Sequence, residues 1–223
     1  MTDLIEHLLE SFENAQEEKS KISDEILEME GYSGSRTRHF YNNLLSMEGA
    51  KYLEVGTWKG STICAAMCGN EADVICIDNW SQFPGPSGES IKEVFEANFT
   101  RWKGKNRATF IEGDCFDLNK DLISKRNIYL YDGEHSYESH YKALTYYIDC
   151  MEDEFIFICD DWTWDVVRLA TTDAMRDLKL KVLYQNEIRY EREKVVSKPY
   201  AEAMWWNGIY FAVLKKSNYI RIG

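Results

Sequence analysis

The chain has 223 residues and a formal net charge of −12, from 26 basic and 38 acidic side chains. This length suits a single α/β domain with one core. The acidic balance disfavours a surface that binds nucleic acid, and no apolar run approaches the roughly 20 residues of a membrane helix. The N-terminus also lacks the features of a signal peptide, so we expect a cytoplasmic protein that binds neither nucleic acid nor membranes.

Two amphipathic helices are predicted before the first strand, at residues 4–17 and 37–47. They form an N-terminal helical extension, residues 1–48, ahead of the main domain, residues 49–223. Three roles are open to this extension. It could cover the sheet, cap a site, or make the subunit contact of a homo-oligomer.

Short and almost continuously apolar runs recur along the main domain, as expected for strands covered on both faces. Five lie at residues 51–55, 74–77, 108–111, 128–131 and 155–159, alternating with predicted helices at 60–67, 90–102, 137–151 and 164–178. This alternation predicts a Rossmann-like, doubly wound sheet. Two further strands, at 181–184 and 208–214, predict an antiparallel C-terminal pair that completes a mostly parallel sheet of seven.

Two of the three prolines fall in residues 79–88, directly after the second predicted strand. Binding groups in doubly wound sheets collect beyond the carboxyl ends of the strands. This segment is therefore a candidate substrate loop or lid, with an ordinary surface connection as the alternative.

The first strand leads into "YLEVGTWKGST", where Gly56 and Gly60 allow the backbone to turn sharply or approach a ligand. The spacing is G-x-x-x-G with Glu54 before it, unlike the G-x-G-x-x-G of dinucleotide sites. A ligand loop is predicted, with simple turn chemistry as the alternative. Asp78 and Asp114 follow the second and third strands in the same way.

Acidic residues also follow the fourth and fifth strands, namely Asp132 and the adjacent pair Asp160 and Asp161. Neighbouring strands lie about 4.8 Å apart, so these carboxylates can converge. Their mutual repulsion would raise their pKa values unless a cation lay among them. Oxygen ligands favour Mg²⁺ or Ca²⁺, with Mn²⁺ also allowed. The alternative for the pair is a helix start, where Asp is a good N-cap.

Together these motifs resemble those of the class I S-adenosylmethionine-dependent methyltransferases. In that family the glycine loop wraps the methionine part of the cofactor, and acids after the next two strands hold the ribose and lie near the adenine. The resemblance implies S-adenosylmethionine as cofactor, with these contact residues: Glu54, Gly56, Thr57, Gly60, Ser61, Asp78, Asn79, Asp114, Cys115 and Asp132.

A closer resemblance, over about residues 36–216, is to the divalent-metal-dependent O-methyltransferases. It implies Asp132, Asp160 and Asp161 as ligands of Mg²⁺, or of Mn²⁺ or Ca²⁺. The catechol enzymes have a lysine base three residues after the first ligand, whereas this chain has His135, as the macrolide sugar enzymes do. The resemblance to that sugar branch implies His135 as the general base, while a helix-start histidine bonded to backbone is the alternative.

The sequence thus predicts metal-assisted O-methylation of a small acceptor, either a sugar or a glycosylated metabolite. The alternatives are a methyltransferase-fold binding module without turnover, transfer to another acceptor class, and a dinucleotide oxidoreductase, which the glycine spacing disfavours. Trp80, Trp162 and Trp164 follow strand ends and are candidate stacking platforms, although tryptophan packs in cores more often. His140 is a candidate second site residue. The six cysteines, without any C-x-x-C pair, are expected to be buried thiols.

Overall fold

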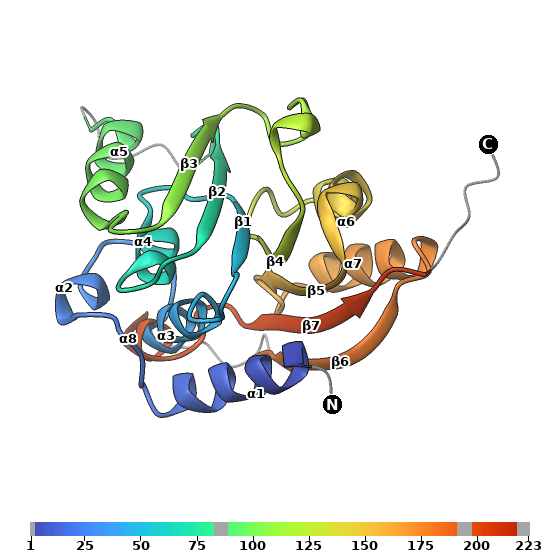
Figure 1. The fold of residues 1–223 in the computed structure, drawn as a ribbon, viewed down its shortest axis with the longest axis horizontal. Helices are drawn as coiled ribbons and strands as arrows, with labels where there is room; N and C mark the ends of the chain where they lie inside the picture. Colours follow the sequence, from blue (N-terminus) through green and yellow to red (C-terminus); the bar gives the residue numbers. More distant parts are fainter. Residues whose placement is uncertain (1–2, 83–88, 191–197, 218–223) are drawn as a thin grey trace.

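A computed structural model describes residues 3–82, 89–190 and 198–217 of the chain (Figure 1). At its centre is one sheet of seven strands in the order β3-β2-β1-β4-β5-β7-β6. All neighbouring strands pair in parallel except β7, which is antiparallel to both β5 and β6. The strands are β1 Lys51–Val55, β2 Asp73–Asp78, β3 Arg107–Glu112, β4 Arg126–Tyr131, β5 Met151–Asp160, β6 Lys181–Ile188 and β7 Ile209–Lys215. The predicted Rossmann-like, mostly parallel sheet is therefore confirmed.

Helices cover both faces of the sheet and enclose one hydrophobic core on each (Figure 1). One face carries α1 Asp3–Gln16, α3 Ser35–Leu44, α4 Ser61–Met67 and α5 Ile91–Trp102, and the other carries α6 Tyr137–Tyr147 and α7 Asp165–Asp177. Two short helices, α2 Asp24–Leu27 and α8 Lys198–Ala203, lie in the connections. Within the described ranges, no helix is both long and apolar enough to cross a membrane.

The predicted N-terminal helices are present, and they pack against the sheet itself. Leu8 of α1 and Phe40 of α3 are fully buried in the same core as Ile158 of β5 and Phe211 of β7. Burial of these side chains favours the docked position of the helices. The extension therefore covers one face of the sheet.

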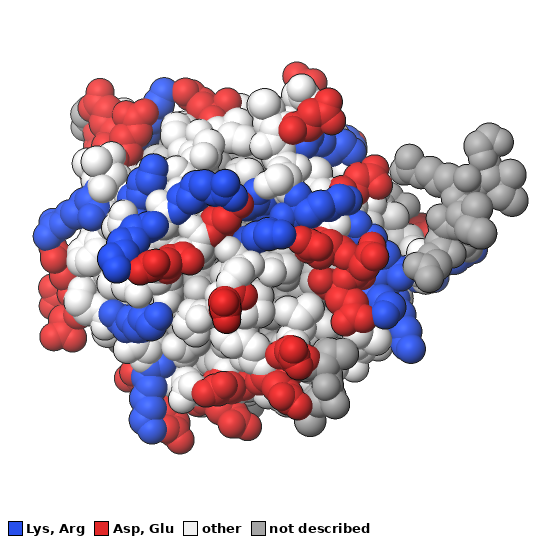
Figure 2. All heavy atoms as spheres, viewed as in Figure 1, with Lys and Arg blue, Asp and Glu red and all other residues white. Residues whose placement is uncertain are grey.

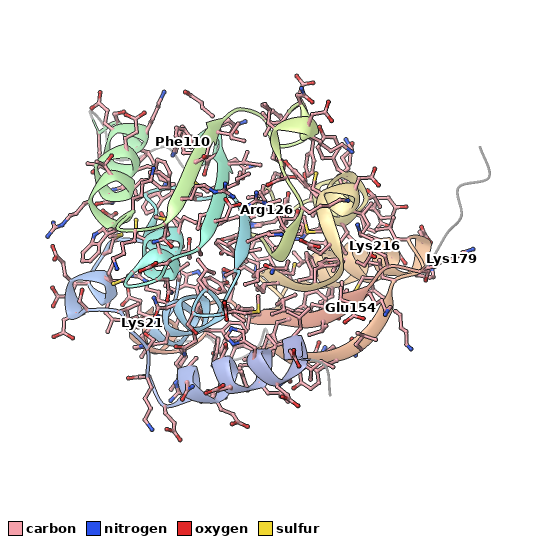
Figure 3. All side chains as sticks on the ribbon, viewed as in Figure 1. Lys21, Phe110, Arg126, Glu154, Lys179 and Lys216 are labelled. Carbon is pink, nitrogen blue, oxygen red and sulfur yellow. The ribbon has the colours of Figure 1, made fainter. Side chains whose placement is uncertain are left out.

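The structure corrects two predicted boundaries around β5. The helix predicted to reach residue 151 ends at Tyr147, and a 3₁₀ turn, Ile148–Cys150, leads directly into a strand that begins at Met151. Residues 152–154 at the start of this strand are acidic, so they are not part of the apolar run from which the strand was predicted. Two of its acids form ion pairs, Glu152 with Lys51 at 2.9 Å and Glu154, labelled in Figure 3, with Lys215 of β7 at 2.6 Å. Of the predicted substrate loop at residues 79–88, the part from 83 to 88 lies outside the described residues.

Inside the molecule a buried charge is paired, whereas on the surface charges of both signs are mixed. Arg126 is fully buried near the start of β4, where it donates to the carbonyl of Asp73 at 3.1 Å and pairs with its carboxylate at 3.1 Å (Figure 3). On the face drawn in Figure 2, basic side chains are interspersed with acidic ones. Mixing of this kind weakens the local potential that a basic nucleic-acid surface would need.

The strand order reverses between β1 and β4, which places their carboxyl ends at the crevice where doubly wound sheets bind ligands. Gly56 follows β1 with a φ of +89°, and a Cβ added there would lie 2.0 Å from the carbonyl oxygen of Asp132. No side chain fits at that distance. The close approach of these two strand ends therefore requires glycine.

We expect Gly56→Ala to lower the free energy of unfolding by at least about 3 kcal/mol, because backbone must move to admit the methyl group. Gly49 is a matched control, since it also has a positive φ, +71°, but has nothing within 4 Å of an added Cβ. Gly49→Ala should cost only about 1 kcal/mol. Urea denaturation measures both losses, and equal losses would contradict the steric explanation.

Candidate active site

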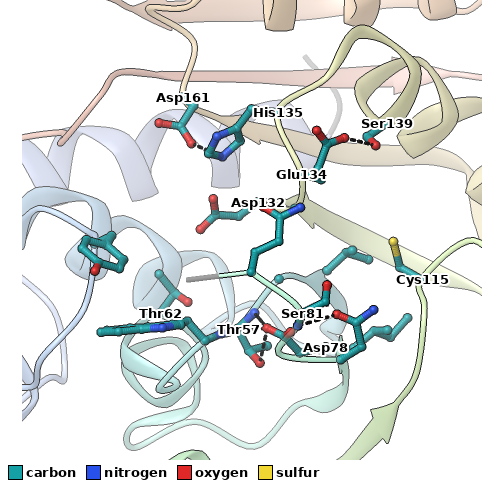
Figure 4. Close-up of a pocket in the computed structure, with 18 of the residues that line it drawn as sticks. Thr57, Thr62, Asp78, Ser81, Cys115, Asp132, Glu134, His135, Ser139 and Asp161 are labelled. Carbon is teal, nitrogen blue, oxygen red and sulfur yellow. Dashed lines mark hydrogen bonds and ion pairs between the residues drawn. The ribbon is translucent and has the colours of Figure 1, made fainter. Parts of the chain in front are cut away.

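A cavity of about 580 Å³ opens at the carboxyl ends of the central strands (Figure 4). Most of the predicted site residues line it: Gly56, Thr57, Ser61, Asp78, Asn79, Asp114, Cys115, Asp132, His135 and Asp161. Glu54, Gly60 and Asp160 are not among its lining residues. The structure therefore brings the strand-end residues to one place, while their individual roles stay predictions.

Glu54 lies beneath the glycine loop and is fully buried. Its carboxylate accepts hydrogen bonds from Thr62 at 2.6 Å and from Tyr52 at 2.7 Å. Burial raises the pKa of Glu54 to about 7, although the two hydrogen bonds oppose the shift. This acid therefore connects the end of β1 to the start of α4 from inside.

Asp78 ties the end of β2 to the glycine loop. Its Oδ2 accepts the backbone N–H groups of Thr57 at 2.7 Å and Trp58 at 2.8 Å, and its Oδ1 accepts that of Trp80 at 2.7 Å (Figure 4). A carboxylate has about four lone-pair sites, so Oδ1 keeps acceptor capacity for a ligand hydroxyl. This geometry is compatible with the predicted contact to a ribose.

The third strand end presents Asp114, Cys115 and Phe116 to the cavity. Asp114 is exposed and accepts the backbone N–H of Phe116 at 2.8 Å, which fixes the turn after β3. Burial, with a smaller contribution from Asp114, raises the pKa of Cys115 to about 12. Cys115 therefore stays a neutral thiol on the cavity wall.

Asp132, His135 and Asp161 meet in the other half of the cavity, and one ligand atom from each lies within 4.8 Å of the others. His135 Nε2 lies 2.7 Å from a carboxylate oxygen of Asp161 (Figure 4). The side-chain amide of Asn207 donates to the second oxygen of Asp161 at 2.7 Å. Asp161 has a φ of +55°, which turns its side chain out of the strand alternation.

This arrangement shifts the pKa values in opposite directions. Burial, and then the charges of Asp160 and Asp161, raise the pKa of Asp132 well above its usual range. Burial also acts to raise the pKa of Asp161, but the hydrogen bond and charge of His135 outweigh it and hold that pKa below its ordinary value. The hydrogen bond to Asp161 raises the pKa of His135 against an opposing effect of burial.

The side chains of the adjacent residues Asp160 and Asp161 have different surroundings. Asp160 is buried, and its Oδ1 accepts the backbone N–H of Asp161 at 2.9 Å. It stands outside the group formed by Asp132, His135 and Asp161, so its role as a metal ligand stays a prediction. The alternative of a helix cap is wrong for both residues, because α7 begins at Asp165 with Trp164 as N-cap.

Two carboxylates and an imidazole at these distances fit a divalent cation. The carboxylate oxygens of Asp132 and Asp161 suit Mg²⁺, and an imidazole ligand would extend the choice to Mn²⁺. A bound cation would also lower the raised pKa of Asp132, because it would offset the repulsion between the clustered carboxylates. The same ring nitrogen of His135 could not both bind a cation and accept a proton.

The aromatic wall of the cavity was only partly predicted. Trp164 lines it, 5.1 Å between ring centres from His135. Trp162 is instead buried and stacked on Tyr210 at 4.4 Å, and Trp80 packs against Phe95 at 5.4 Å, so the prediction of stacking platforms is wrong for these two.

The sequence did not predict a second aromatic group that lines the cavity. Tyr32 lies 4.6 Å from Trp58 and 6.0 Å from Trp206 between ring centres, and all three line the cavity. Trp206 and Asn207 come directly before β7. Because β7 is antiparallel, its amino end lies at the edge where the other strands have their carboxyl ends. The antiparallel direction predicted for the last strand could therefore have indicated that Trp206 and Asn207 lie at the site.

His140 does not line the cavity. It is buried beside His135, 6.2 Å between ring centres, with Nδ1 3.5 Å from the sulfur of Cys159. Burial, and then the charge of His135, lower the pKa of His140 to about 4, so the ring is neutral. Five of the six cysteines are buried as predicted, and Cys115 is the partly exposed one.

Comparison with known proteins agrees with this architecture. Residues 53–162 match a family model described as a methyltransferase domain. The SAH-bound methyltransferase PaMTH1 of Podospora anserina is similar in structure, with a TM-score of 0.57 and 13% identity over 98% of this chain and 89% of that chain. An O-methyltransferase from Bacillus cereus in complex with SAH gives a TM-score of 0.57 and 12% identity over 96% of this chain and 92% of that chain.

TrmN from Thermus thermophilus is also similar, with a TM-score of 0.52 and 11% identity over 81% of this chain. This chain spans about half of that protein, 49% of its length. No curated protein sequence matches. At these identities the likeness establishes the Rossmann-like methyltransferase fold.

The contact between His135 and Asp161 predicts a pH-dependent stability. The raised pKa of His135 contributes stability that is complete below its unfolded value, about 6.5, and is lost as pH rises through the folded value. The lowered pKa of Asp161 contributes stability that is lost only as pH falls below about 4. The pair therefore contributes fully between about pH 4 and 6.5.

We expect His135→Gln, which keeps a donor but removes the charge, to lower the free energy of unfolding by about 1 kcal/mol at pH 5.5. The difference from the unmodified protein should shrink steadily toward pH 9. Urea denaturation across this range measures it. The trend should vanish in an Asp161→Asn background, and its persistence there would contradict the assignment to this pair.

Proposed function

We propose that this chain, which has the methyltransferase fold and matches a methyltransferase-domain model over residues 53–162, transfers a methyl group from S-adenosylmethionine. More specifically, we propose O-methylation of a hydroxyl on a small acceptor, assisted by a divalent cation. The observation that carries the proposal is the meeting of Asp132, Asp161 and His135 in the same cavity as the glycine loop.

The cofactor half of the cavity would hold S-adenosylmethionine, which supplies an electrophilic methyl group when bound. The loop from Gly56 to Ser61 would surround its methionine part. Asp78, with acceptor capacity left on Oδ1, would accept from the ribose hydroxyls, and Phe116 would lie against the adenine. The SAH-bound relatives of the same fold support this choice of cofactor.

In the acceptor half, Asp132 and Asp161 would hold the cation, which orients the acceptor and lowers the pKa of its hydroxyl. His135 would take the hydroxyl proton at Nε2. In the structure this nitrogen is engaged by Asp161, whose charge favours the protonated ring. His135 must lose its proton before it can act as base, so activity should increase with pH through its raised pKa.

The aromatic walls favour an acceptor with a flat or weakly polar face. Trp164, which is 39% exposed, lines the cavity together with Tyr32, Trp58 and Trp206. Carbohydrate faces pack well on such rings while their hydroxyls remain available for carboxylates and cations. These features support a sugar or a glycosylated metabolite as acceptor.

Calorimetric titration with S-adenosylmethionine, in the presence and in the absence of Mg²⁺, tests cofactor binding. We expect binding in both cases. A panel of sugars, phenols and glycosides with labelled cofactor then tests transfer, which EDTA should suppress. Lack of cofactor binding would refute the proposed function. Binding without transfer to any acceptor would favour a binding module without turnover.

Asp161→Asn should lower kcat by about 100-fold or more, while the Kd for S-adenosylmethionine stays within about twofold, because Asp161 would contact the cation and not the cofactor. Asp160→Asn is the informative comparison, since its carboxylate lies outside the group around His135. A comparable loss in Asp160→Asn would support its predicted role as a ligand. Full activity of Asp161→Asn would refute the cation site.

Trp164→Ala should raise the KM for a sugar acceptor by up to about tenfold, because one face of the stacking site is lost. The Kd for S-adenosylmethionine should not change. Trp162→Phe is the matched control, since Trp162 is buried on Tyr210 away from the cavity. An unchanged acceptor KM in Trp164→Ala would show that the acceptor binds elsewhere.

A further inference from the structure

A second cavity, of about 420 Å³, adjoins the active-site cavity and has no part in the reaction described above. Its volume lies in the usual range of small-molecule sites, about 300–1,000 Å³. Tyr32, Trp58 and Trp206 line both cavities. Trp206 directly precedes Asn207, which donates to Asp161 in the acceptor half of the active site. This shared aromatic group therefore connects the second cavity with the acceptor half.

The segments that form the second cavity are fixed to each other. Most of its lining comes from the loop between α2 and α3, and Glu202 and Trp206 come from the segment between α8 and β7. A Cβ added to Gly34 would lie 2.0 Å from the carbonyl oxygen of Met204. Ser35 Oγ donates to the carbonyl of Ala203 at 3.0 Å. The cavity is thus formed before any ligand binds, as is usual for small-molecule sites.

A buried cation lines this cavity. Arg38 is only 3% exposed, and its Nε donates to Ser33 at 2.9 Å. Its Nη1 donates to the carbonyls of Ile26 at 2.7 Å and Met29 at 2.8 Å. The other amino group, Nη2, donates to no atom in the described part of the chain and lies beside Gly31, which also lines the cavity. Because a buried charged donor without an acceptor is costly, Nη2 would stabilise a ligand oxygen placed there.

Three exposed carboxylates, those of Glu28, Glu30 and Glu202, line the same cavity. They outnumber the single cation, Arg38, so an anionic ligand is disfavoured. An apolar ligand is disfavoured too, because it would remove water from these charges without forming hydrogen bonds. A hydroxyl group suits both kinds of charge, since it can donate to a carboxylate and accept from a guanidinium. The charges therefore favour a ligand that carries several hydroxyl groups.

We propose that the second cavity binds a sugar ring, the unit next to the one that is methylated, so that the acceptor carries at least two sugar units. This inference rests on the proposed function, whose acceptor it specifies. The ring would pack against the shared aromatic group, in which Tyr32 is 51% exposed. Its hydroxyl groups would donate to Glu28 and accept from Nη2 of Arg38.

The first test compares methyl transfer to phenyl monoglycosides and phenyl diglycosides of glucose, galactose, mannose and rhamnose. At least one diglycoside should have a kcat/KM about tenfold or more above that of its monoglycoside, because hydrogen bonds to charged groups commonly contribute a factor of this size. Glu28→Trp removes a carboxylate and fills the cavity, so the ratio should fall to about one. Glu25→Trp is the matched control. Glu25 is an exposed acid of α2 that pairs with Arg101 and does not line the cavity, and its variant should keep the ratio.

The second test needs no turnover. Calorimetric titration of the cofactor-free protein with the same glycosides should give a Kd about tenfold lower for the favoured diglycoside than for its monoglycoside. Glu28→Trp should remove this difference, and Glu25→Trp should retain it. Tighter binding of a diglycoside without any methyl transfer would refute the proposed function and leave the sugar site standing. If no diglycoside is favoured in either test, or if the preference survives Glu28→Trp, the inference is overturned whether or not methyl transfer occurs.

Discussion

The structure depends on how carboxylates are accommodated at the buried ends of adjacent parallel strands. Glu54 within β1, Asp132 directly after β4 and Asp160 as the last residue of β5 lie at the carboxyl ends of three neighbouring strands, on the same sheet face. Each would repel the others in a low-dielectric interior unless protons, donors or a cation intervened. Glu54 is satisfied by two hydroxyl groups, Asp160 by the backbone of Asp161, and Asp132 faces the cavity.

The N-terminal segment acts together with this edge of the sheet. Arg38 donates to the carbonyls of Ile26 and Met29, which fixes the loop that carries Tyr32 to the cavity. Lys59, buried within the glycine loop, pairs with Glu30 at 2.7 Å and with Glu89 at 2.7 Å. These contacts attach the first 40 residues to the loop that would hold the cofactor. The extension thus forms part of the wall of the site as well as a cover for the sheet.

Residues at strand ends could be predicted, and residues brought in by loops could not. Asp78, Asp114, Asp132 and Asp161 each follow an apolar run, so their position at one sheet edge follows from parallel pairing. Tyr32 follows no strand and reaches the cavity only because its loop folds back over Trp58. The prediction of Trp162 as a stacking platform failed for the same reason. Its position after β5 did not indicate that its ring would pack on Tyr210.

The sequence by itself determined the alternation of strands and helices, the doubly wound sheet and the acids at its carboxyl edge. Apolar periodicity is a local property, and the connection rules of βαβ units then restrict how successive strands can pair. Only the tertiary structure decided which way each acid points. Asp160 continues the strand alternation into the core, whereas the positive φ of Asp161 turns its side chain toward His135. Side-chain direction after a strand depends on one backbone dihedral angle, and that angle is selected by contacts with residues distant in sequence, such as Asn207.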